Sequence, residues 1–246
     1  MNIENRIALI TGTKRIGSAV AMALADKGAD VALTFNRSRE EAETTAQKIR
    51  LLGRKALAVR ADVSVAGDVS RLVDQVEREL GTVSILVNMA SVYRSKPFDE
   101  ITEKDWDANM NVNLKSAFLC SKAVVAGMKS KGGGRIINFA DWIAASRRPR
   151  YTGYLPYYVS KVGIVGLTEI LALELAPHNI LVNSIAPGPI LAPPDLTAEE
   201  DSEVRKATPL GRWGGELEIA KAVLSLIEAD FITGECIRVD GGRHVK

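Results

Sequence analysis

The chain alternates short apolar runs with longer stretches in which apolar residues recur every three or four positions. A short run rich in Val, Ile, Leu and Phe is typical of a buried strand, and the longer repeat is typical of a helix. Strands are predicted at residues 6–11, 30–35, 56–60, 83–87, 135–140, 180–185 and 235–239. Helices are predicted at residues 16–27, 38–52, 65–80 and 102–129, and in a stretch that runs through Lys161 to residue 176.

The predicted strands are too apolar to have one face in water. Strands buried on both faces belong to a parallel sheet that helices cover on both sides. Glycines follow three of the helices, at Gly28, Gly53 and Gly81, where helices commonly end. Neither a linker nor a change in composition divides residues 1–246. We therefore expect one α/β domain with a doubly wound parallel sheet.

Composition narrows the classes of partner. The net charge is +2 and no block of five Lys or Arg residues occurs, so no nucleic-acid partner is expected. No apolar run is long enough for a membrane span, and no secretory leader precedes the first strand. Cys120 and Cys236 lie in apolar segments and are expected to be buried free thiols. These features predict a cytoplasmic protein with a small-molecule substrate, no membrane partner and no metal site.

A turn with two glycines joins the first strand to the first helix. Its sequence is Thr11-Gly12-Thr13-Lys14-Arg15-Ile16-Gly17. Glycine in this position lets the backbone turn tightly and approach a pyrophosphate, which binds at the N-terminus of the helix. Lys14 and Arg15 add positive charge for phosphate. The context predicts a dinucleotide site of the Rossmann type that includes Gly12, Ile16 and Gly17.

The turn after the second strand indicates which dinucleotide binds. An acidic residue there selects NAD, whereas a basic residue accommodates the 2′-phosphate of NADP. This chain has Asn36, Arg37 and Ser38, without an acid. Asp62 and Val63 follow the third strand, where Asp62 could accept from the adenine amino group. The predicted cofactor is therefore NADP(H).

Candidate catalytic groups follow the fifth strand. Tyr157 and Lys161 are four residues apart and share one face of a helix, so the ammonium can stabilise a phenolate. A tyrosine ordinarily titrates near pH 10, and a nearby cation brings its pKa toward neutrality. Asp141 directly follows the strand, at the sheet edge where catalytic groups are presented. The simpler interpretation of Asp141 is a turn former or helix cap.

Over essentially its whole length the chain resembles the short-chain dehydrogenase/reductase family. The matching residues are Thr11-Gly12 with Gly17, Asp62-Val63, Asn88 with Ala90, Asn113, Tyr157 with Lys161, and Pro187-Gly188. The resemblance implies that Tyr157 is the proton donor, and that Lys161 binds the nicotinamide ribose and lowers the pKa of the tyrosine. It also implies that Asn113 holds a water of a proton relay, and that Pro187, Gly188 and Ile190 contact the nicotinamide carboxamide.

Within the family the chain is most similar to the pteridine reductases. Ordinary members have serine where Asp141 stands, and that serine donates to a substrate carbonyl. An ionised carboxylate only accepts hydrogen bonds, which suits a substrate with N–H groups. The resemblance is based on Lys14-Arg15, Asn36-Arg37-Ser38, Asp141, and Tyr93, which would stack on a flat pterin. The implied substrate contacts are Tyr93, Asp141 and Arg15.

Two other functions stay open. If Asp141 is only a turn residue, the better interpretation is a carbonyl reductase of the 3-oxoacyl-carrier-protein reductase type. A non-catalytic dinucleotide-binding protein is suggested only by the glycine turn, which is one residue shorter than the family pattern. Met89 also replaces a usual asparagine, and the segment from Asp141 to Tyr157 is about three residues longer than is typical.

Two features concern mobility and assembly. Residues 191–206 contain few apolar positions and are expected to form a mobile lid over the substrate.

The stretches 113–128 and 162–176 are apolar on more than one face, which predicts contact with further copies of the chain. Family resemblance implies a homotetramer.

Overall fold

A computed structural model describes all 246 residues. Seven parallel strands form one sheet in the order β3-β2-β1-β4-β5-β6-β7. The strands are β1 (Ile7–Thr11), β2 (Asp30–Phe35), β3 (Ala56–Arg60), β4 (Val83–Asn88), β5 (Gly134–Phe139), β6 (Ile180–Pro187) and β7 (Cys236–Val239). β1 and β4, where the strand order reverses, are neighbours in the middle of the sheet. A crevice for a ligand opens outside the carboxyl ends of strands at such a point.

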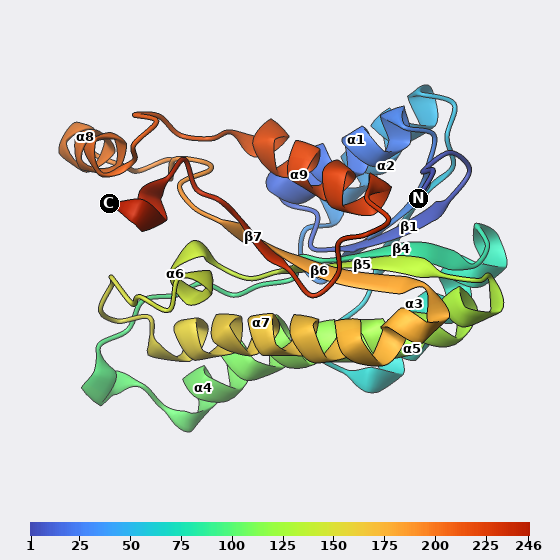
Figure 1. The fold of residues 1–246 in the computed structure, drawn as a ribbon, viewed down its shortest axis with the longest axis horizontal. Helices are drawn as coiled ribbons and strands as arrows, with labels where there is room; N and C mark the ends of the chain where they lie inside the picture. The colour runs from blue at the N-terminus through green and yellow to red at the C-terminus, as the bar shows by residue number, and fades with distance from the viewer.

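Helices cover both faces of the sheet, as expected (Figure 1). On one face lie α1 (Ile16–Asp26), α2 (Arg39–Leu51) and α9 (Glu216–Glu228). On the other lie α3 (Ala66–Glu79), α4 (Glu103–Asn109), α5 (Ser116–Ser130) and α7 (Leu155–Leu175). Apolar residues of each layer pack against the strands in one of two large buried clusters. The predicted fold class, a single α/β sheet with helices on both faces, is confirmed.

The structure differs from the predicted elements in two places. The stretch 102–129 is not one uniform helix, because a π-helical turn, η2 (Met110–Lys115), separates α4 from α5. Such turns widen a helix locally and occur frequently at functional sites. The pattern also did not predict α9, although Ile219, Val223 and Leu226 are buried on one face of it at helical spacing.

The predicted lid contains a helix of its own, α8 (Ala198–Ala207). The Thr197 hydroxyl oxygen accepts from the Glu200 N–H, and the Glu200 carboxylate accepts from the Thr197 N–H, which forms a capping box, but none of the residues of α8 is buried. The helix is therefore stabilised locally and contributes no buried residue to the domain, while the mobility of the lid stays a prediction.

The two cysteines are unpaired. Cys120 lies on α5 and is fully buried, and burial raises the pKa of its thiol to about 12. Cys236 at the start of β7 is partly buried. None of the helices combines the length and the hydropathy that a membrane crossing requires.

Candidate active site

A cavity of about 630 Å³ opens at the carboxyl ends of the strands. Residues that follow β1, β4, β5 and β6 all line it, so segments far apart in the sequence meet there. Asp141, Tyr157 and Lys161 are among them. The structure thus brings the three predicted catalytic groups into one cavity.

Asp141 is in contact with Tyr157. It lies between β5 and the short helix α6 (Trp142–Ala145), and its Oδ1 accepts from the Ile143 N–H at 3.0 Å. Its Oδ2 accepts from the Tyr157 hydroxyl at 2.7 Å. One carboxylate oxygen of Asp141 therefore caps a helix while the other contacts Tyr157 in the cavity, and its catalytic role stays a prediction.

Lys161 lies one turn beyond Tyr157 on α7 and is buried. Its ammonium donates to the Phe139 carbonyl at 2.7 Å and is 5.7 Å from the centre of the Tyr157 ring. The last carbonyl of β5 therefore holds the ammonium beside the phenol. Lys161 makes no ion pair with Asp141.

Burial shifts the pKa of each of these three groups in the direction that favours the neutral form of the group. It raises the pKa of Asp141, although the Ile143 and Tyr157 hydrogen bonds oppose the shift. Burial, and next the Asp141 carboxylate, hold the pKa of Tyr157 well above 10. Burial lowers the pKa of Lys161 to about 8. The expected lowering of the Tyr157 pKa by Lys161 is therefore not found in the free protein. There the phenol stays protonated, and its hydroxyl donates a hydrogen bond to Asp141.

Asn113 lies in η2, is buried and does not line the cavity. Its Oδ1 accepts from the Val92 N–H at 2.7 Å, and its Nδ2 donates to the Val92 carbonyl and to Ser160 Oγ at 3.2 and 3.0 Å. The side chain ties the segment after β4 to α7. Because these protein partners occupy the amide, its predicted role of holding a water stays a prediction.

Aromatic rings form one wall of the cavity. Tyr93 is stacked on Tyr154, with ring centres 4.5 Å apart, and meets the edge of Tyr157 at 4.7 Å. One face of Tyr93 is thus already covered, so a flat substrate has to use the other face or displace Tyr154. Trp142, Tyr151 and Trp213 also line the cavity. The sequence analysis did not single out these three residues.

The turn after β1 fits a pyrophosphate. Gly12 has a φ of 86°, and a Cβ on it would lie 3.1 Å from the backbone of Met89 and Ala90. A Cβ on Gly17 would lie 2.1 Å from the Gly12 carbonyl oxygen. No side chain caps the N-terminus of α1, and the buried hydroxyl of Thr13 has no partner. The free N–H groups at this terminus can therefore bind an anion.

Arg15 takes the place of a fingerprint glycine. It has a φ of 51°, a conformation that glycine adopts without strain. Its guanidinium donates to the Ala192 carbonyl at 3.0 Å. The phosphate turn is thereby connected to the beginning of the predicted lid, and Lys14, Arg15 and Ile16 all line the cavity.

Other predicted cofactor residues lie around this turn. Asn36 and Arg37 are exposed after β2, and Asn36 donates to Asp62 at 3.4 Å. Arg37 makes neither an ion pair nor a side-chain hydrogen bond and is available to a phosphate, beside Ser38, which has no capping contact with α2. Val63 is buried in the core.

The remaining cofactor residues divide between the cavity wall and the layer below it. Pro187, Gly188 and Ile190 line the cavity after β6. Asn88 and Ala90 do not. Asn88 is buried and donates to Asn138 Oδ1 at 2.9 Å, while the Ala90 N–H donates to Thr11 Oγ1 at 3.2 Å. These two residues hold the strand ends together under the site.

Known proteins share both sequence and fold with this chain. A protein-family profile described as "Enoyl-(Acyl carrier protein) reductase" matches residues 11–244. A 3-oxoacyl-[acyl-carrier-protein] reductase of Staphylococcus epidermidis is 33% identical over 98% of this chain and 100% of its own length. The structure of a short-chain dehydrogenase/reductase from Serratia marcescens superposes with a TM-score of 0.92, at 34% identity over 99% of this chain and 100% of that one. A blue fluorescent protein from a metagenomic library, solved in complex with NADPH, has a TM-score of 0.91 at 32% identity over 99% of both chains.

Proposed function

The chain belongs to the short-chain dehydrogenase/reductase family, and on that premise we propose that it is an NADP(H)-dependent reductase of a flat, N–H-bearing substrate such as a dihydropterin. The proposal depends on one observation above all, the 2.7 Å hydrogen bond from Tyr157 to Asp141 inside the cavity. The membership of the family is established, whereas the substrate class is our inference from the site.

The reaction needs a hydride and a proton. A bound reduced nicotinamide would supply the hydride, and the residues that would hold the dinucleotide are Gly12, Lys14, Arg15, Gly17 and Gly188. Tyr157 holds a proton that its hydrogen bond directs at Asp141. Asp141, whose pKa burial raises, can take up that proton and pass it to a ring nitrogen of the substrate. Reduction of a C=N bond then places the hydride on carbon and this proton on nitrogen.

The pair formed by Tyr157 and Asp141 is less suited to the reduction of a carbonyl group. For that reaction the Tyr157 hydroxyl has to turn away from Asp141 and donate to the substrate oxygen. An ionised Asp141 beside it would repel the developing alkoxide. Toward a pterin the carboxylate is instead an acceptor for ring N–H and amino groups, and the aromatic wall around Tyr93 offers surfaces for stacking.

The names of the relatives favour a second candidate, the reduction of a 3-oxoacyl thioester. The relatives reported above do not confirm the pteridine branch that the sequence predicts, and they support this alternative better. A turnover assay with NADPH distinguishes the two, with dihydropterins and acetoacetyl-coenzyme A compared on the same enzyme. Turnover of the thioester alone would exclude the first candidate.

Arg37 should set the preference for NADPH over NADH. A charge-assisted hydrogen bond contributes about 1.5–3 kcal/mol, which corresponds to a roughly 10- to 150-fold change in affinity. Arg37→Ala should raise the KM for NADPH by about this factor and leave the KM for NADH nearly unchanged. Arg39→Ala, a change at an exposed arginine two residues further along, should alter neither KM. Equal losses with both cofactors would show that Arg37 has only a structural role.

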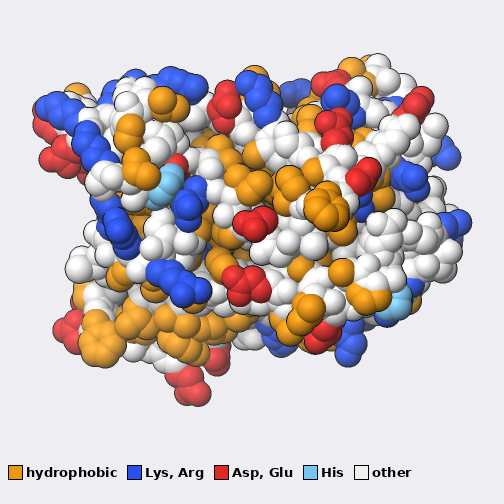
Figure 2. Space-filling view, in the orientation of Figure 1, with side chains coloured by type: hydrophobic (Ala, Val, Ile, Leu, Met, Phe, Trp, Pro, Cys, Tyr) orange, Lys and Arg blue, Asp and Glu red, His pale blue; other side chains and the backbone are white.

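We further propose that the chain assembles as a homotetramer. Apolar side chains remain exposed on the predicted contact helices, among them Phe118 on α5 and Ile170 and Leu173 on α7, the last 74% exposed. Figure 2 shows further hydrophobic side chains gathered over the first half of α7, where Leu155, Val159 and Val162 are exposed. Exposed apolar surface of this kind is typical of an interface.

Light scattering at micromolar concentration should therefore give a mass near four times 26.6 kDa. Leu173→Glu with Ile170→Lys should shift the protein to a smaller species, because both changes place charge in the proposed contact. Leu51→Glu, at a leucine that is 86% exposed on α2, should leave the mass unchanged. A monomer in the unmodified protein would contradict the proposal.

A further inference from the structure

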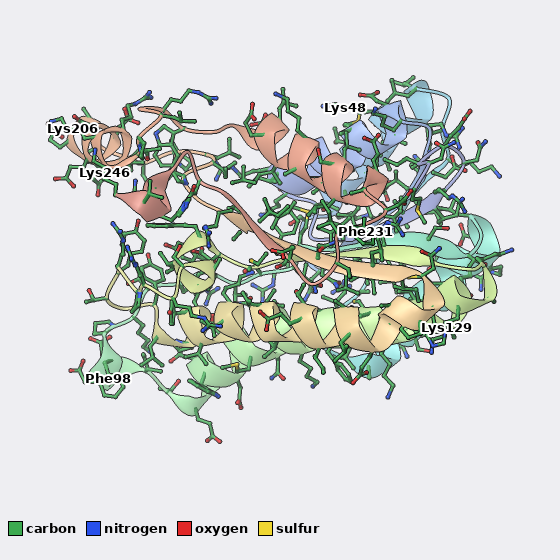
Figure 3. The ribbon with its side chains drawn as sticks, viewed as in Figure 1. Lys48, Phe98, Lys129, Lys206, Phe231 and Lys246 are labelled. Carbon is green, nitrogen blue, oxygen red and sulfur yellow. The ribbon has the colours of Figure 1, made fainter.

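The outer part of the cavity has a cation that the proposed reaction does not use. Arg243 belongs to the C-terminal turn η4 (Arg243–Val245) and lines the cavity. In Figure 1 this turn lies beside α6 and α8, at the end of the molecule remote from the N-terminus. The last residues are held there, since Lys246 donates to the Lys206 carbonyl and both residues lie at this end in Figure 3.

The guanidinium of Arg243 is held firmly. It packs against the Trp142 ring, with the guanidinium carbon 5.5 Å from the ring centre. One nitrogen, Nη1, donates to the Val204 carbonyl and to Thr208 Oγ1 at 3.0 and 3.3 Å, and Nη2 donates to the Tyr151 hydroxyl at 3.1 Å. Its Nε has no protein acceptor. A guanidinium fixed in this way loses little freedom on binding a ligand.

Positive charge on the cavity wall exceeds negative charge. Lys14, Arg15, Lys161 and Arg243 line the cavity, whereas Asp141 is its one carboxylate. The phosphates of a dinucleotide would neutralise Lys14 and Arg15, and the charge of Lys161 is balanced by that of Asp141, although the two side chains form no ion pair. Arg243 forms no salt bridge, so its charge has no counterpart in the protein. Figure 2 shows further Lys and Arg side chains around this end of the molecule and Asp and Glu side chains at its margin.

We propose that Arg243 binds an acidic group, a carboxylate or a phosphate, on the part of the substrate that lies away from the reduced bond. Trp142 directly follows Asp141 and contacts Arg243, so one substrate can reach both the proton-donating pair and this guanidinium. Arg243 is thus a residue that determines specificity, and the substrate is a heterocycle with an anionic tail. The inference depends on the proposed function for the position of the reduced bond.

The test compares ligands that differ only in the tail. Dihydrobiopterin has an uncharged tail, dihydrofolate carries carboxylates, and dihydroneopterin monophosphate carries a phosphate. The unmodified enzyme should favour one or both acidic ligands over dihydrobiopterin in kcat/KM, and Arg243→Gln should remove that advantage by about 10- to 100-fold, mainly through KM. The ligand that loses most identifies the acidic group. Arg243→Lys keeps the positive charge but loses the planar guanidinium that can make two parallel hydrogen bonds, so it should retain part of the advantage.

Two controls separate this role from a structural one. In Arg243→Gln the loss of kcat/KM with dihydrobiopterin should be much smaller than the loss with the acidic ligands, because a loosened α8 would impair every ligand alike. Arg148→Gln, at an exposed arginine that does not line the cavity, should affect none of them. An equal loss with neutral and acidic ligands, or no preference for acidic ligands in the unmodified enzyme, would overturn the proposal.

A readout without turnover keeps this test independent of the proposed function. Trp142 and Trp213 line the cavity, so quenching of their fluorescence reports binding of each ligand in the presence of NADP⁺. If no pterin is reduced, the proposed function fails, and acetoacetyl-coenzyme A is compared with neutral ethyl acetoacetate by the same measurement. An unchanged ratio of acidic to neutral Kd in Arg243→Gln then refutes the role of Arg243 by itself.

Discussion

Changing Asp141 to asparagine should lower the reduction of a dihydropterin by about 10²- to 10⁴-fold, the usual contribution of a positioned proton donor. Asparagine is a good N-cap, so its side-chain oxygen can still accept from the Ile143 N–H and keep α6 in place. What it cannot do is take a proton from Tyr157 and pass it on. NADPH binding, measured by fluorescence titration, should be unchanged.

Asp141→Ser distinguishes the two candidate substrates. Serine is also a good N-cap, and it is the residue of ordinary family members at this position. If the substrate is a pterin, this variant loses turnover as well. If the enzyme acts on a 3-oxoacyl thioester, the serine can donate to the carbonyl, and acetoacetyl-coenzyme A turnover is kept or raised. Full pterin turnover in both variants would leave Asp141 as a helix cap alone.

Changing Tyr157 to phenylalanine should lower kcat by about 10²- to 10⁴-fold with either class of substrate, because the phenol is the proton source in both reactions. The ring stays and only the hydroxyl is lost, so the packing of the buried side chain should persist. Tyr158→Phe is the matched control, since Tyr158 is the next residue of α7 and does not line the cavity. A Tyr157→Phe enzyme with more than a tenth of the original kcat would place the proton donor elsewhere.

The pH profile of the unmodified enzyme gives an independent check. Asp141 can take up the Tyr157 proton only as a carboxylate, and burial raises the pKa above which it is ionised. Activity should therefore fall as the pH drops below that raised pKa. Lys161, with a pKa of about 8, loses its charge as the pH rises through that value, so activity should fall there as well. The Asp141→Asn variant should lack the fall on the acid side.

The same shift affects stability. Because the pKa of Asp141 is higher in the folded protein than the ordinary 3.8, its contribution to the free energy of unfolding is fully present below pH 3.8. That contribution is lost as the pH rises through the raised value. Thermal unfolding followed across this window should show the unmodified protein losing stability relative to Asp141→Asn as the pH rises.

The sequence determined the fold class and the order of the elements. Strands this apolar cannot face water, and alternation with helices leaves a covered parallel sheet as the arrangement that buries them. It also placed Tyr157 beside Lys161, because residues four apart share a helix face, and it placed the glycine turn before α1. These are local relations, which spacing along the chain fixes. The helix α9 had the same kind of signal, in Ile219, Val223 and Leu226, and could have been found from it.

Only the tertiary structure decided how these parts meet. The contact between Asp141 and Tyr157, the occupied amide of Asn113 and the stacking of Tyr154 on Tyr93 join residues from different elements. The pKa of Tyr157 is high and not low in the free protein, because burial and a neighbouring carboxylate raise it. Arg243 reaches the cavity from the last turn of the chain, where no motif marks it. Spacing determines what lies on one face of one helix, whereas burial, charge balance and contacts between distant segments depend on how the elements pack.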